Sequence, residues 1–163
     1  MILTSGETQT EFEFHVVGYQ FADVLDEEYD ANWLMVRIRV KMWEGEWTKT
    51  DPCLLTWEGH WLANWLADLE AGRETQREMD FLESNVVFQF LERKGRQLRF
   101  WVELETGDER FGVSLVISEE ALREALSDWC WRLRMFPVRA SEGRRCRPFN
   151  DKRTGCVVCG TGD

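Results

Sequence analysis

Apolar and polar residues alternate along two stretches near the start of the chain, the pattern of half-buried β-strands. In residues 10–21, TEFEFHVVGYQF, apolar side chains alternate with Glu and His. In residues 32–43, NWLMVRIRVKMW, they alternate with Arg and Lys. Gly45 lies between two short aromatic segments and predicts a turn into a partner strand. Asp51–Pro52 is expected to close this section.

Apolar residues at three- and four-residue spacing predict two amphipathic helices. Residues 55–71 carry a wide Leu and Trp stripe, with Thr56 as a candidate N-cap and Gly72 as a stop. The width of the stripe indicates that this helix lies across a sheet. Ser118, followed by two glutamates, predicts the start of the second helix, and Pro137 disfavours helical geometry just before it.

Between the two helices the sequence predicts further strands, separated by turns that contain Gly95 and Gly107. They cover residues 79–93, 96–105 and 110–118. Sequential strands with short turns favour an antiparallel meander. The predicted fold is therefore α+β: a mostly antiparallel, meander-rich sheet of about 6–8 strands with the two amphipathic helices packed on it.

Composition indicates one globular domain followed by a different kind of tail. The chain has 163 residues, 44% of them hydrophobic and 31% charged. Residues 1–139 hold 27 acidic and 15 basic residues and are expected to form a single domain, whereas residues 140–163 hold 3 acidic and 5 basic residues and are expected to be a flexible, Cys-containing tail. With no long apolar run and no secretory leader pattern, the protein is expected to be cytoplasmic, with free thiols.

Candidate catalytic residues are few. The two histidines, His15 and His60, fall on a predicted strand and a predicted helix, where packing or surface roles are typical. The sequence contains no Gly-rich phosphate loop, HExxH or GxSxG motif. We therefore expect a protein that is not an enzyme and uses no cofactor.

The tail contains three cysteines, Cys146, Cys156 and Cys159, the last two in a CxxC spacing. Two such thiolates can bind one Zn²⁺, but a structural site needs four ligands, and Cys53 and Cys130 belong to elements predicted to be buried. We therefore expect no metal site. A metal-binding or redox module remains the alternative function, as does an uncharacterised protein-interaction domain.

Residues 23–30, DVLDEEYD, concentrate five acids and no base directly before a hydrophobic strand. They lack the spacing of an EF-hand calcium loop, which leaves a solvated loop or a protein-binding surface. The net charge of −10 disfavours nucleic acid as a partner and would attract a basic protein.

Five segments, in this order, resemble the WapI family of bacterial immunity proteins. They are Tyr19–Phe21, Asp30–Leu34 (DANWL), the Leu/Trp-rich helix at 55–71, Phe81–Asn85 and Phe136–Arg139 (FPVR). Ala22 and Ser84 stand where the family pattern often has Pro. The resemblance covers most of residues 10–139 and leaves the tail uncovered.

This resemblance implies a non-catalytic cytosolic immunity protein that binds the toxin domain of a secreted polymorphic toxin, in the namesake case a tRNA-cleaving nuclease. A basic toxin domain is the expected partner, without nucleic acid or membrane, and the oligomeric state is left open. We expect the contact surface to include the acidic residues and the aromatics beside them: Asp23, Asp26, Glu27, Glu28, Tyr29, Asp30 and Trp33.

Overall fold

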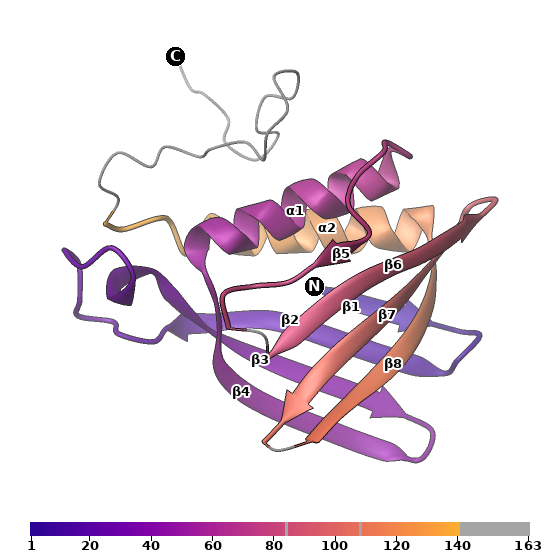
Figure 1. Cartoon of the computed structure of the whole chain (residues 1–163), viewed down its shortest axis with the longest axis horizontal. Helices are drawn as coiled ribbons and strands as arrows, with labels where there is room; N and C mark the ends of the chain where they lie inside the picture. The colour runs from indigo at the N-terminus through magenta and orange to yellow at the C-terminus, as the bar shows by residue number, and fades with distance from the viewer. Residues whose placement is uncertain (84, 108, 141–163) are drawn as a thin grey trace.

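The computed structural model describes residues 1–83, 85–107 and 109–140. Along this part of the chain, eight strands form two four-stranded antiparallel sheets, and two helices lie beside them (Figure 1). The predicted α+β class is confirmed. Periodicity did not show that the strands divide between two sheets, because it reports which face of a strand is buried and not which strand lies beside it.

The first sheet has the order β1-β2-β3-β4 and contains the two alternating stretches of the N-terminal part. Its strands are β1 (Ile2–Ser5), β2 (Thr10–Tyr19), β3 (Trp33–Met42) and β4 (Gly45–Leu55). The strand β4 runs through Pro52, so the expectation that Asp51–Pro52 ends it is wrong. Proline is tolerated there because β4 is an edge strand, and the register shifts beside it, between Leu34 and Met35.

The second sheet has the order β5-β6-β7-β8 and is the predicted meander. Its strands are β5 (Glu78–Met79), β6 (Val86–Lys94), β7 (Gln97–Thr106) and β8 (Glu109–Ser118). The single strand expected over residues 79–93 is in fact two strands, because the chain leaves the sheet after Met79 and re-enters it at Val86.

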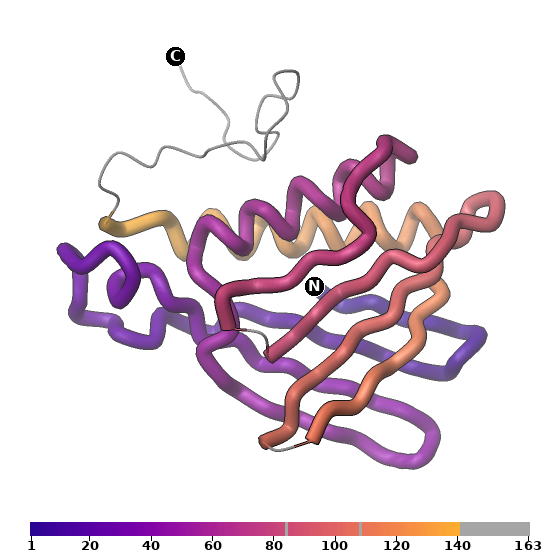
Figure 2. Tube along the Cα trace, viewed as in Figure 1, coloured from indigo at the N-terminus to yellow at the C-terminus, as the bar shows by residue number. Residues whose placement is uncertain are grey.

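Helices α1 (Thr56–Glu70) and α2 (Glu119–Leu133) run side by side along the sheets (Figures 1 and 2). They pack closely because Gly59 has no side chain: an added Cβ would lie 2.8 Å from Leu133 Cδ2. In the resulting contact the indole of Trp129 donates a hydrogen bond to the Gly59 carbonyl at 3.0 Å. Among the described residues, neither helix is long and apolar enough to cross a membrane.

The helix starts show one correct prediction and one error. Ser118 caps α2, its hydroxyl accepting a hydrogen bond from the Ala121 N–H at 3.1 Å. Thr56 does not cap α1. The N-cap residue is Leu55, and its N–H donates a hydrogen bond to the Glu58 carboxylate at 2.8 Å. The Thr56 hydroxyl donates instead to the side chain of Asn32, which lies outside the helix.

The core lies between the two sheets and the helices, and three aromatic rings join these layers. Phe14 of β2 packs against Phe88 of β6, with ring centroids 5.6 Å apart, and against Trp129 of α2, at 5.5 Å. All three residues are fully or almost fully buried. Aromatic side chains bury large areas, so this cluster accounts for much of the cohesion between the layers.

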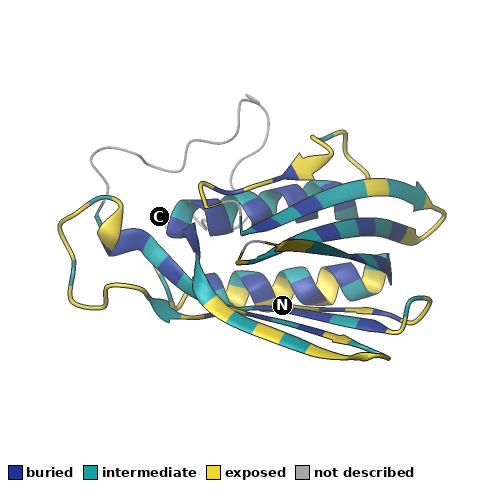
Figure 3. Ribbon diagram, turned by 60° about the horizontal axis from the view of Figure 1, so that its bottom comes forward, coloured by how far each residue is buried: buried dark blue, intermediate teal, exposed yellow. Residues whose placement is uncertain are grey.

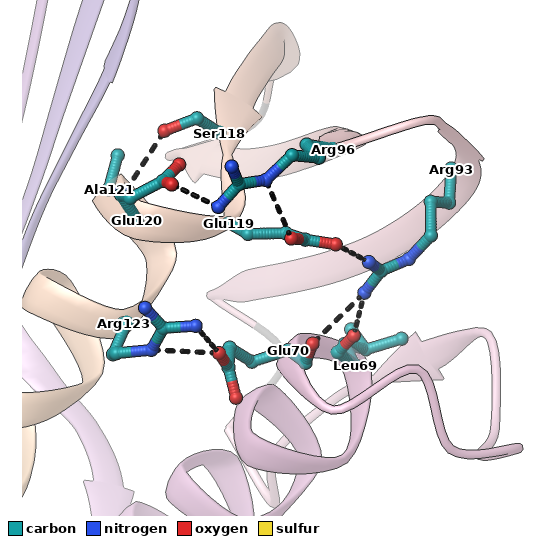
Figure 4. A network of polar contacts seen from close by, with 9 residues as sticks. All are labelled: Leu69, Glu70, Arg93, Arg96, Ser118, Glu119, Glu120, Ala121 and Arg123. Carbon is teal, nitrogen blue, oxygen red and sulfur yellow. Dashed lines mark hydrogen bonds and ion pairs between the residues drawn. The ribbon is translucent and has the colours of Figure 1, made fainter.

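Charged residues hold the C-terminus of α1 and the N-terminus of α2 to the second sheet (Figure 4). The Arg93 guanidinium on β6 donates to the carbonyls of Leu69 and Glu70 at the end of α1 and pairs with Glu119 at the start of α2. Arg123 of α2 pairs with the Glu70 carboxylate. These placements put a cation at a helix C-terminus and an acid at a helix N-terminus, which the helix dipoles favour.

Candidate functional site

The predicted contact residues lie on the loop that joins β2 to β3, on the short 3₁₀ turn Asp30–Asn32 that ends it, and at the start of β3. Most of the loop is exposed, as Figure 3 shows. The exposed members of the predicted set are Asp23, Asp26, Glu27, Tyr29 and Asp30. Glu28 and Trp33 are half-buried. The structure therefore brings five of the seven residues to one exposed segment.

The side chain of Asn32 fastens the end of this loop. It is fully buried and uses its whole hydrogen-bonding capacity. The amide nitrogen donates to the carbonyl oxygens of Glu28 and Ala140 at 2.7 and 2.8 Å. The amide oxygen accepts from the Thr56 hydroxyl at 2.8 Å and from the Arg139 N–H at 2.9 Å. One side chain thus joins the loop, helix α1 and the end of the described chain.

Arg139 fastens the beginning of the same loop. Its guanidinium lies 3.4 Å from the centroid of the Tyr19 ring, a cation–π arrangement. One nitrogen of the guanidinium also donates to three carbonyl oxygens of the loop. These acceptors are Phe21 at 3.2 Å, Ala22 at 2.9 Å and Val24 at 3.3 Å. A cation 118 residues away along the chain from Phe21 therefore sets the path of the loop.

Tyr19 completes this attachment at the end of β2. Its hydroxyl donates to the Pro137 carbonyl at 2.5 Å, and its ring packs edge-on against Phe136 with centroids 5.6 Å apart. Partial burial raises the pKa of Tyr19, while the Arg139 charge acts in the opposite direction. The phenol therefore stays protonated, as the hydrogen bond to the carbonyl requires.

The carboxylates of the loop are left facing outward. Within residues 1–83, 85–107 and 109–140, Asp23, Asp26, Glu27 and Asp30 take part in no ion pair or side-chain hydrogen bond. Several acids elsewhere are paired: Glu13, for example, binds Arg37 at 2.7 Å across β2 and β3, which lowers the pKa of that glutamate. The loop is therefore a place where negative charge is held rigidly without a described counter-charge.

Exposed apolar side chains accompany these acids. Phe21, Leu25 and Tyr29 are 39%, 63% and 44% exposed. The Tyr29 ring also packs against Trp57 in the first turn of α1, with centroids 5.9 Å apart. Large side chains that are anchored on one side and exposed on the other are typical of contact surfaces.

A second exposed segment, which the sequence did not indicate as a site, borders the same turn of α1. The Glu58 carboxylate accepts from the Leu82 N–H at 2.7 Å, so residues 80–83 lie against the helix N-terminus. Leu82 is 61% exposed, and Asp80 and Glu83 are exposed beside it without an ion pair among the described residues. The sequence signal was only the short Phe81-Leu82-Glu83 step in a region expected to be strand.

Burial raises the pKa of Glu58 despite its two backbone hydrogen bonds, with the charges of Asp80 and Glu83 acting in the same direction. The carboxylate is nevertheless committed to two N–H groups, those of Leu55 and Leu82. Its role is to position the 80–83 segment against α1.

Comparison with known families gives the class of protein to which this geometry belongs. A model of the immunity protein WapI-like family matches residues 1–137. The chain belongs to this family. Neither a curated protein nor a solved structure matches the chain. The resemblance noted from five short segments is confirmed.

In this member of the immunity protein family, the five segments converge. Tyr19–Phe21, Asp30–Leu34 and Phe136–Arg139 meet around the β2–β3 loop through Asn32 and Arg139. Phe81–Asn85 meets the start of α1 through Glu58, and the Asn85 amide donates to the Pro52 carbonyl at 3.0 Å. The shared segments thus include Asn32 and Arg139, which fasten the β2–β3 loop. They also include some of the exposed side chains, among them Phe21, Asp30 and Leu82.

Within the described part of this immunity-family fold, the candidate thiols and histidines are not gathered at one place. Burial raises the pKa of Cys53 to about 12, so its thiol is unreactive. Cys146, Cys156 and Cys159 lie outside the described residues. Burial lowers the pKa of both His15 and His60. The described part of the chain brings no three potential metal ligands together.

Proposed function

We propose that this protein is a non-catalytic immunity protein that binds and neutralises a basic toxin domain, using the β2–β3 loop as part of the contact surface. Membership of the immunity family over residues 1–137 is the observation that carries the neutralising role. The identity of the surface is supported by the exposed apolar residues of the loop and by Asp23, Asp26, Glu27 and Asp30, which have no ion-pair partner within the described residues.

The β2–β3 loop is preorganised for binding. Asn32 and Arg139 hold the loop backbone at both ends, so little conformational entropy remains to be lost on binding. Unpaired carboxylates increase the rate of encounter with a basic protein, and the half-anchored Tyr29 can be buried at the contact. An RNA-cleaving toxin would fit, because its phosphate-binding surface is basic and the loop offers a similar array of negative charge.

Co-expression with the toxin domain encoded beside its gene tests the role. We expect survival of the host cell and a complex that persists through purification. Unprotected cells and no complex would exclude the pairing.

Charge reversal tests the surface. The variant Asp23→Lys, Asp26→Lys, Glu27→Lys should lower the association rate at low salt by about tenfold or more and weaken its salt dependence. Glu28 is left unchanged because it is half-buried.

The matched control is Glu44→Lys, Glu109→Lys, Glu124→Lys, which changes the net charge equally, from −10 to −4, at exposed positions elsewhere. Association rates that fall equally in both variants would show that overall charge, and not the loop, steers binding.

A further inference from the structure

The described chain ends directly beside the exposed apolar and acidic face of the β2–β3 loop. The Ala140 carbonyl accepts the Asn32 amide hydrogen bond at 2.8 Å, and the Arg139 N–H donates to the same side chain at 2.9 Å. Figures 1 and 2 show this end of the chain next to the loop. Residues 141–163, which lie outside the described residues, therefore begin at this surface.

The loop face combines two properties that define what fits it. Its exposed apolar side chains are Phe21, Leu25 and Tyr29, which together are a substantial share of the large exposed hydrophobic residues of the described chain. Its exposed carboxylates have no cation partner among the described residues. An occupant should therefore supply guanidinium or ammonium groups together with at least one apolar side chain.

The sequence that follows Ala140 has this composition. Residues 144–153, RRCRPFNDKR, contain five of the chain's basic residues, one acid and Phe149. Arg144 is only four residues beyond Ala140, and four residues can span up to about 14 Å, which is enough to reach the loop that Ala140 contacts. Because the two are joined by so short a link, the effective concentration of the segment at the loop is on the order of millimolar.

We propose that residues 144–153 dock in cis on the face formed by residues 21–30, with Arg144, Arg145 and Arg147 against the loop carboxylates and Phe149 against its apolar side chains. A basic partner of this surface must then displace the segment. Weakly bound basic proteins fail to do so, and this competition makes the surface selective. The docking stands independently of the proposed function, whereas the competition rests on it.

Amide NMR spectra of the full-length chain test the docking. The variant Arg144→Gln, Arg145→Gln, Arg147→Gln should shift the resonances of residues 21–30 at about 20 mM salt, and the difference from wild type should vanish at about 500 mM salt, where the charges are screened. Resonances of residues 21–30 that are unchanged at low salt would overturn the proposal.

The reciprocal variant Asp23→Asn, Asp26→Asn, Glu27→Gln should shift the amides of residues 144–149. The control Glu44→Gln, Glu109→Gln, Glu124→Gln removes the same number of charges elsewhere and should leave the amide resonances of residues 144–149 unshifted. Equal shifts in both would reveal only non-specific attraction, and shifts that depend on protein concentration would assign the segment to a second copy. Either result would overturn docking in cis.

The competition has its own readout. If the segment covers the toxin-binding face, the arginine variant should associate with the cognate toxin domain at least about threefold faster than wild type. Equal association rates for the variant and wild type would show that the segment does not compete with the toxin domain. They would not change the docking result from NMR. Absence of docking with intact toxin binding would refute this inference and leave the proposed function standing.

Discussion

Replacement of Asn32 by alanine should be among the most destabilising polar substitutions in this protein. The side chain is fully buried and makes four hydrogen bonds, of 2.7 to 2.9 Å, to four different residues. Alanine leaves two carbonyl oxygens, one hydroxyl and one N–H without a protein partner. The isosteric Asn32→Asp should be at least as damaging at pH 7, because a carboxylate oxygen would then face the carbonyls of Glu28 and Ala140.

The magnitude follows from the positions of these partners. The Thr56 hydroxyl is fully buried, and leaving it unsatisfied costs about 1–3 kcal/mol. The other three partners are at half-buried positions that water can reach, so each contributes about 0.5–1 kcal/mol. We expect a total loss of about 2.5–6 kcal/mol, a large fraction of the roughly 5–15 kcal/mol by which a domain is stable.

Urea unfolding followed by circular dichroism and Trp fluorescence measures the loss. Asn85→Ala is the matched control, because its half-buried amide donates to the Pro52 carbonyl at 3.0 Å and should cost about 1 kcal/mol. Hydrogen exchange of residues 21–30 should accelerate in the Asn32 variant and not in the control. If Asn32→Ala loses no more stability than Asn85→Ala, the Asn32 side chain does not hold the loop.

Three further predictions concern other parts of the fold. Gly112→Ala should lower the free energy of unfolding by about 1–3 kcal/mol, since the added Cβ would lie 2.0 Å from the Trp101 ring; Gly6→Ala, with nothing within 4 Å, should be nearly neutral in the same thermal unfolding assay. Glu13→Gln should cost about 1 kcal/mol or less at pH 7, because the arginine partner is half-exposed. That cost should shrink as pH falls through the lowered pKa of this glutamate, where wild type loses the ionised carboxylate, and a difference that grows in acid would contradict the assignment. Cys53, with its pKa of about 12, should escape iodoacetamide at pH 8 in the folded protein and react after denaturation, as read by peptide mass spectrometry.

Local pattern was sufficient for much of the secondary structure. Alternation located β2 and β3, helical spacing located α1 and α2, and Ser118 and Gly72 lie where their cap and stop chemistry indicated. These features depend on neighbours within a few residues, so the sequence carries them directly.

Long-range partners were not available from the sequence. Thr56 was expected to cap its own helix, but its hydroxyl binds Asn32 and a glutamate takes over the cap. The two short strands β1 and β5 carry too few residues to show a period, and both exist through pairing with a longer neighbour. A polar side chain can satisfy several equivalent partners, and the packed fold decides which one it meets.

The sequence by itself determined the class of fold, the acidic run at residues 23–30 and the family resemblance. Only the tertiary structure decided that this run is a fastened surface and not a free turn. The reason is that Arg139 and Ala140, more than a hundred residues further along the chain, close on it through hydrogen bonds to loop carbonyls and to Asn32. Contacts at that separation follow from how the sheets and helices pack, and no local periodicity encodes them.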